Sequence, residues 1–158
     1  MKKFIVLLVI FTLLISCSEQ VSEIDPAQAY YRVFESLINT DLVLNNEMVY
    51  LAFDLTNAKL TDTVPFIQLA QNYCDTNGYK LLIMSFEELE EAGYIEDIYK
   101  GFKEGVVISF HDKELTDTKL VTAANKWKSG IGAVGADFTV EKINDSWEIT
   151  GTDRAWIS

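Results

Sequence analysis

The sequence predicts an α+β fold: N-terminal helices and a short βαβ-like unit, then a C-terminal antiparallel β-meander of about four strands. Apolar residues first recur at helical spacing between short apolar runs, which indicates helices alternating with strands. From Gly105 onwards the apolar period changes to two, which is typical of strands. The chain has 158 residues and is 49% hydrophobic, enough for one buried core.

The first seventeen residues form a segment distinct from this domain. Two lysines precede the apolar run 4–15, which has the length of a signal-peptide core and is shorter than the roughly 20 residues of a membrane span. Leu-Ile-Ser-Cys at 14–17 then resembles the lipobox of bacterial lipoproteins. In that family the cysteine sulfur receives a diacylglyceryl group and the preceding chain is removed. The resemblance implies a signal peptide over 1–16 and lipidation of Cys17.

The lipoprotein resemblance also implies a location. It implies export and anchoring of the protein to the cell envelope through the lipid, facing the periplasm. Ser18 follows the cysteine; an aspartate at that position retains some lipoproteins in the inner membrane, so its absence favours the outer membrane. The lipidated cysteine and the polar, acidic residues after it form a tether over 17–25. This leaves 26–158 as a single α+β domain.

Charge and cysteine content narrow the choice of partners. The formal net charge is −11, and it becomes −13 once the two lysines of the signal segment are removed. Such a chain repels phosphate backbones, so we expect no nucleic acid partner. The mature protein retains Cys74 as its one unmodified cysteine, so no intrachain disulfide can form. Cys74 lies on an apolar helical face and is interpreted as buried.

The first half of the domain reads as helices and parallel strands. A helix is predicted from 26 to about 39, with Asp25 as its N-cap and Pro at the first position. Residues 47–55 are apolar on both faces, which indicates an interior strand. A second helix begins near Pro65 and ends before an Asn-Gly stop, and 79–84 is the next strand. This order indicates a right-handed βαβ unit.

A third helix is predicted by the capping box that Ser85 and Glu88 form. A further helical turn is predicted over 94–99. The acids of the third helix favour its macrodipole, and they lack the spacing and the turn glycine of a calcium loop.

Four strands follow from the period-two pattern, over 106–111, 120–128, 138–143 and 147–152. In the second of them one face presents Val121, Ala123, Asn125 and Trp127. The terminal residues 154–158 are too apolar for a loose tail, so we expect them to pair with the sheet or pack on it.

Residues 130–135 spell Gly-Ile-Gly-Ala-Val-Gly, a literal match to the dinucleotide-binding fingerprint. That site needs a helix to begin at the glycines, because the pyrophosphate binds the helix N-terminus. Residues 137–143 read instead as a strand. We interpret the glycines as a hairpin connection or bulge, and expect no nucleotide cofactor.

No catalytic constellation stands out, and we assign no catalytic residue, metal or cofactor. A single histidine, His111, excludes a histidine-rich metal site. Ser109, His111 and Asp112 are close in sequence, but neighbouring strand positions point to opposite faces. Whether the protein is an enzyme stays open, and the residues favour a non-catalytic protein.

Three residues are candidates for a ligand pocket. Asp54 lies near the end of a predicted interior strand, where α/β proteins place polar site residues. His111 ends another strand, and Trp127 is an aromatic residue in the meander.

Element order loosely resembles the cystatin-like and nuclear-transport-factor-2-like folds, which implies a sheet curved around a helix. The C-terminal stretch also resembles small bacterial lipoproteins that carry no known activity. We therefore interpret the chain as a non-catalytic interaction or binding module of the cell envelope, with an envelope protein as partner. One alternative is a small-ligand-binding protein or hydrolase with a pocket in the curved sheet, and another is an envelope inhibitor or immunity protein. An exposed aromatic patch favours the first, and a cavity containing Asp54 or His111 favours the second.

Overall fold

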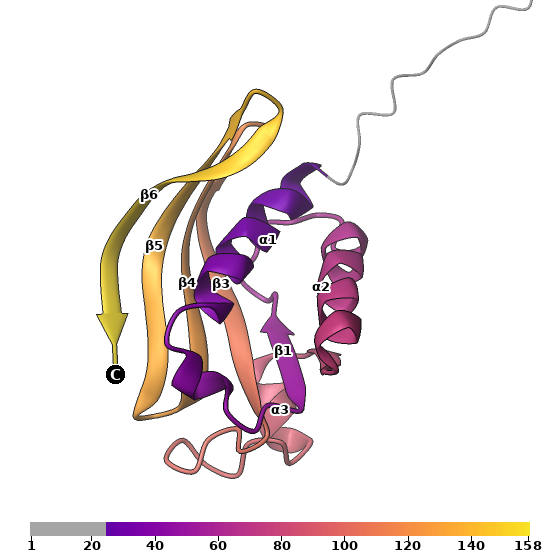
Figure 1. Cartoon of the computed structure of the whole chain (residues 1–158), viewed down its shortest axis with the longest axis vertical. Coiled ribbons are helices and arrows are strands. Elements are labelled where there is room, and N and C mark those ends of the chain that lie inside the picture. The colour runs from indigo at the N-terminus through magenta and orange to yellow at the C-terminus, as the bar shows by residue number, and fades with distance from the viewer. Residues whose placement is uncertain (1–24) are drawn as a thin grey trace, which may run out of the picture.

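The structure, a computed structural model, describes residues 25–158, and it confirms the α+β class (Figure 1). The signal peptide, Cys17 and nearly all of the predicted tether lie outside the described residues. Six strands form one mixed sheet in the order β2-β1-β3-β4-β5-β6. Within residues 25–158, no helix is both long and apolar enough to cross a bilayer. The elements are α1 (Asp25–Ile38), η1 (Leu42–Asn45), β1 (Tyr50–Asp54), α2 (Val64–Asn77), β2 (Lys80–Ile83), α3 (Phe86–Glu91), β3 (Gly105–Leu115), β4 (Lys119–Ser129), β5 (Gly132–Ile143) and β6 (Ser146–Ile157).

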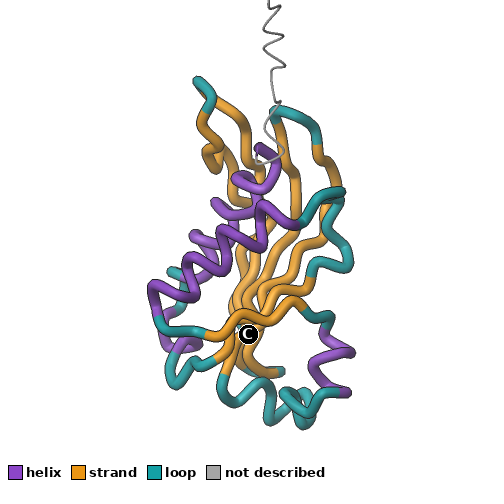
Figure 2. Tube along the Cα trace, turned by 90° about the vertical axis from the view of Figure 1, so that its right-hand side faces the viewer, coloured by secondary structure: helices purple, strands orange, loops and turns teal. Residues whose placement is uncertain are grey.

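Strand β1 is the interior strand that the sequence predicts, and it pairs in parallel on both sides. Leu51 lies opposite Leu81 of β2 and Val106 of β3. Crossovers between parallel strands are right-handed, and β2 and β3 flank β1 on opposite sides, so their connections must cover opposite faces. Figure 2 shows this arrangement, with the two long helices on one side of the sheet and α3 on the other.

The larger core lies between the sheet and helices α1 and α2. Helix α1 crosses the concave face of the meander (Figure 1). Phe34 on α1 meets the ring of Phe53 on β1 edge to face, with 5.1 Å between ring centroids. The strands present small residues beneath the helix, Ala124 and Ala136, which allow close approach. Cys74 of α2 is buried in this core, as predicted, and burial raises the pKa of its thiol to about 11.

A buried polar contact ties α1 to β3. The Tyr30 hydroxyl donates to the Asp112 carboxylate, which also accepts the backbone N–H of Lys59 at 2.6 Å. Burial and the neighbouring carboxylate raise the pKa of Tyr30. Asp112 therefore holds together the first helix, the loop after β1 and the third strand.

A lysine is also buried on the concave face. Lys126 of β4 has none of its surface exposed. Its ammonium donates to the carbonyl oxygens of Ile38, Thr40 and Asp41, and to the side-chain oxygen of Asn45 at 3.0 Å. The last turn of a helix leaves carbonyl groups without partners, so this lysine supplies the donors for the end of α1 and the segment after it.

The meander is longer than the sequence pattern predicts. Strand β5 begins at Gly132, so two of the three fingerprint glycines, Gly132 and Gly135, lie in a strand, and only Gly130 is in the turn. Irregular register near these glycines confirms the bulge, and the chain continues as a strand where a dinucleotide site needs a helix. The terminal residues pair with the sheet as expected, with Ile157 opposite Val134.

One predicted element is wrong. Residues 94–99 form a bend, an irregular stretch and a turn, not a helical turn. Gly93 and Gly101 bracket this segment with φ of 79° and 67°, and these left-handed positions redirect the chain. Ile95 is buried in a second, smaller core beneath α3, so the apolar spacing here reflects burial by a loop.

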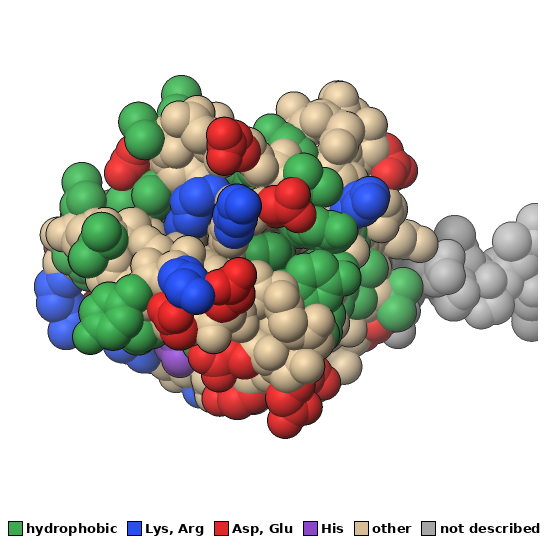
Figure 3. Space-filling view, turned by 90° about the horizontal axis from the view of Figure 1, so that it is seen from below, with side chains coloured by type: hydrophobic (Ala, Val, Ile, Leu, Met, Phe, Trp, Pro, Cys, Tyr) green, Lys and Arg blue, Asp and Glu red, His purple; other side chains and the backbone are tan. Residues whose placement is uncertain are grey.

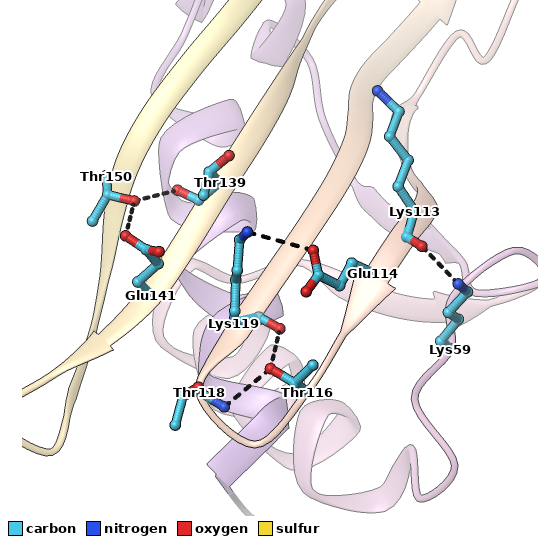
Figure 4. A network of polar contacts seen from close by, with 9 residues as sticks. All are labelled: Lys59, Lys113, Glu114, Thr116, Thr118, Lys119, Thr139, Glu141 and Thr150. Atoms are coloured by element: carbon cyan, nitrogen blue, oxygen red, sulfur yellow. Dashed lines mark hydrogen bonds and ion pairs between the residues drawn. The ribbon is translucent and has the colours of Figure 1, made fainter.

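Polar contacts connect neighbouring strands and the loop after β1, away from α3 (Figure 4). Thr150 donates to Glu141 at 2.9 Å, and the ammonium of Lys59 donates to the backbone oxygen of Lys113 at 2.8 Å. Lys119 pairs with Glu114 at 3.4 Å. These groups are largely exposed to solvent, so they stabilise the sheet only weakly.

Candidate functional site

A pocket of about 320 Å³ opens on the sheet face that carries α3, at the carboxyl end of β1. All three residues predicted as pocket candidates line it: Asp54, His111 and Trp127. In open parallel sheets, ligands bind at this end of the strands, where successive connections leave on opposite faces. The full lining is Asp54, Thr56, Asn57, Phe86, Glu87, Val107, Ser109, His111, Asn125 and Trp127.

The floor of the pocket begins where β1 ends. Asp54 accepts the backbone N–H of Thr56 at 2.9 Å, and this local hydrogen bond turns the chain out of the strand. Its second oxygen accepts the N–H of Phe86 at 3.3 Å. One carboxylate thus fixes both the loop after β1 and the start of α3.

The capping box of α3 forms as predicted and holds the pocket wall. Glu88 N–H donates to the Ser85 hydroxyl at 3.2 Å, and Ser85 N–H donates to the Glu88 carboxylate at 2.7 Å. Phe86 and Glu87 follow the cap directly and line the pocket. The cap satisfies helix-terminal amides within the protein.

Strands β3 and β4 supply the opposite wall. Ser109 lies opposite Asn125 across the strand pair, and the Ser109 hydroxyl donates to the Asn125 side-chain oxygen at 3.0 Å. His111 is exposed at the pocket edge, and Trp127 is half-buried. Because strand side chains alternate between faces, these four residues lie on the α3 face and Asp112 on the other.

Two aromatic rings form one corner of the pocket. Phe86 and Trp127 lie edge to face, with 4.8 Å between centroids and 73° between ring planes. They come from α3 and β4, so the corner depends on α3 being fixed in place by Asp54.

The charge of the lining is negative. Its acidic side chains are those of Asp54 and Glu87, and the ten residues that line the pocket include one histidine and no lysine or arginine. The Glu87 side chain is exposed, and its carboxylate makes no hydrogen bond or ion pair with any other residue of the 25–158 range. Nowhere in that range do three or more histidine, cysteine, aspartate or glutamate side chains gather closely enough to hold a metal ion.

The geometry does not assemble a hydrolytic triad from the neighbours in β3. Ser109 donates to Asn125, and Asp112 accepts from Tyr30 on the opposite face. The sequence reading placed these residues on alternating faces, and the structure confirms that placement.

Several lining residues were missed from sequence, although a signal existed for some. Residues two positions apart in a strand lie on the same face of the sheet. Ser109 therefore shares a face with His111, and Asn125 shares one with Trp127, so both could have been predicted from these two candidates. Glu87 was assigned only to the helix macrodipole. Phe86 and Asn57 enter the pocket through tertiary contacts that have no local sequence pattern.

A second, apolar groove of about 460 Å³ lies between α1 and the end of β6. Trp156 lines it and is 46% exposed. Its other apolar lining comprises Leu37, Val134, Ala136, Phe138, Ala155 and Ile157. On the face of the molecule that Figure 3 shows, exposed apolar side chains are interspersed with lysines and acids.

No protein-family model, curated protein or solved structure matches the chain.

Proposed function

We propose that the chain is a non-catalytic, lipid-anchored binding protein of the cell envelope that holds a small polar ligand in the α3-face pocket. The observation that supports this proposal is the convergence of Asp54, His111 and Trp127 from three strands on one cavity. The pocket combines the apolar side chains of Phe86, Val107 and Trp127 with seven polar or charged ones, and polar groups that converge on a cavity give a small-molecule site its specificity. A volume of about 320 Å³ suits a small molecule rather than a polymer.

The test is calorimetric titration of the full-length protein, in nonionic detergent, with a panel of small polar compounds. We expect at least one compound to bind saturably, and the Trp127→Ala variant to lose that binding by about tenfold or more, because the substitution removes one aromatic wall. Trp156→Ala is the matched control, since this tryptophan lines the other groove. Equal binding by wild type and Trp127→Ala would contradict the proposal.

The apolar groove favours a second candidate function, docking of an envelope protein. Trp156 and Ile157 expose apolar surface beside the free edge of β6, and aromatic residues are enriched in protein interfaces. The two tryptophan variants separate the candidates. A partner captured by wild type and by Trp127→Ala, but lost with Trp156→Ala, would assign the function to the groove.

The anchoring proposal rests on the lipobox resemblance of residues 14–17. We expect a Cys17→Ser variant, expressed in a bacterium, to lose fatty-acid labelling and to leave the membrane fraction. Two or three acyl chains would anchor the wild-type protein, and the variant would carry none. Metabolic labelling with a tagged fatty acid, followed by fractionation, measures both effects. Cys74→Ala is the control: its thiol is buried, and labelling should persist. Membrane fractionation of wild type tests the outer-membrane location.

A further inference from the structure

We infer that the ligand of the α3-face pocket is a small organic cation, such as a quaternary or primary ammonium compound, held by the Glu87 carboxylate and the Phe86–Trp127 corner. This inference rests on the proposed binding function and specifies its ligand class. Three separate observations support it: the negative charge of the lining, the geometry of the two aromatic rings, and the hydrogen bonds that nearby backbone donors already make within the protein.

The charge of the pocket selects against anions. Asp54 and Glu87 are its acidic residues, and apart from His111 the lining holds no basic side chain, so no lysine or arginine can pair with a carboxylate or phosphate. The whole chain carries a formal charge of −11, so the surrounding field also attracts cations. An anionic ligand would meet two carboxylates without a counter-ion.

Two backbone donors at the start of α3 are also committed within the protein. Phe86 N–H donates to Asp54, and Glu88 N–H donates to Ser85. Asp54 is oriented by two backbone donors, while the Glu87 carboxylate has no partner elsewhere in the described chain. Glu87 is therefore the free counter-ion of the pocket.

The aromatic corner matches the size and polarity of an alkylated ammonium group. Ring planes 73° apart present two apolar surfaces at nearly a right angle. The face of a tryptophan or phenylalanine ring attracts a cation within about 6 Å of its centroid, most strongly when water is excluded. A metal ion would need three or more closely placed ligands, a grouping that residues 25–158 do not provide.

The test compares choline with its uncharged isostere 3,3-dimethyl-1-butanol and with glucose, by calorimetric titration of the full-length protein. The cation–π and carboxylate contributions predict that choline binds about tenfold more tightly than the isostere. Glu87→Gln, which keeps the shape of the side chain, should erase most of this preference. Trp127→Leu should weaken choline more than the isostere. Glu90→Gln, on the same helix but outside the lining, is the control that should change neither.

Each outcome is decisive for the ligand class. Preference for choline that Glu87→Gln abolishes supports the inference. Binding of glucose or the isostere as tight as, or tighter than, that of choline overturns the cation assignment and leaves the proposed binding function standing. Binding of none of these three compounds by a protein that melts cooperatively overturns the cation assignment, and if the wider panel of polar compounds also fails to bind, the proposed binding function falls with it. Melting curves of each variant show whether a loss of binding reflects a loss of fold.

Discussion

Replacing Lys126 with methionine is expected to lower the free energy of unfolding by about 3–5 kcal/mol, because several buried oxygens lose their donor at about 1–3 kcal/mol each. Methionine fills a similar volume but donates nothing to the carbonyl oxygens of Ile38, Thr40 and Asp41. Denaturant unfolding of the full-length protein, followed by tryptophan fluorescence, measures the change. Lys119→Met is the control on the same strand: it breaks only an exposed ion pair and should cost less than about 1 kcal/mol.

The loss should also depend on pH in a defined direction. Burial lowers the pKa of Lys126 to about 8, whereas free lysine titrates near 10.4. Between these values the unfolded chain binds more protons than the folded one, so this residue makes unfolding free energy rise with pH. The gap between wild type and Lys126→Met should therefore widen from pH 8 to about pH 10. Cys74, whose raised pKa has the opposite effect, is present in both proteins and cancels. A gap that stays constant or narrows would contradict the assignment.

Gly101→Ala is expected to cost about 3–4 kcal/mol of stability, the sum of a left-handed backbone penalty and steric overlap. Gly101 has φ of +67°, and an added Cβ would overlap the Lys128 carbonyl oxygen and lie 2.6 Å from the Ser129 Cβ. That carbonyl also accepts the N–H of Phe102 at 2.7 Å, the bond that holds this loop to β4. Thermal and denaturant unfolding report the loss.

A second glycine separates the two causes. Gly93 has φ of +79°, but an added Cβ would meet no atom within 4 Å. Gly93→Ala should therefore cost only about 1 kcal/mol, for the backbone conformation alone. Equal losses in the two variants would show that the predicted overlap at Gly101 relaxes freely.

Local chemistry made part of this fold predictable. The Ser85–Glu88 box, the strand alternation of the meander and the strand–helix–strand order each act within a few residues, and each appears in the structure. The helical turn predicted at residues 94–99 was wrong because a loop that buries Ile95 has the same apolar spacing as a helical face. Strand β5 begins at Gly132, earlier than predicted, and the ring of Trp156, 21 residues later in the chain, packs against the bare Gly135 backbone within it.

Only part of the site could be predicted, because local sequence patterns do not report contacts between distant residues. Asp54, His111 and Trp127 could be named because strand ends and aromatic residues are local features. Their convergence on one pocket depends on the right-handed crossover that carries α3 over the opposite face from α2. The role of Lys126 was not predicted, because its partners belong to the end of α1 and the segment after it, more than 80 residues earlier.

The position of α1 has a consequence for when the domain can fold. The first helix of the chain packs against its last strands, with Trp147 and Ile149 of β6 in or against the same core as Tyr30 and Phe34. Contacts of this sequence separation delay folding, because most of the chain must be present before they form. A chain emerging N-terminus first from a ribosome or a secretion channel cannot close this core until β6 has appeared. The topology therefore keeps the nascent chain open during synthesis, which is compatible with the proposed export of the chain before it folds.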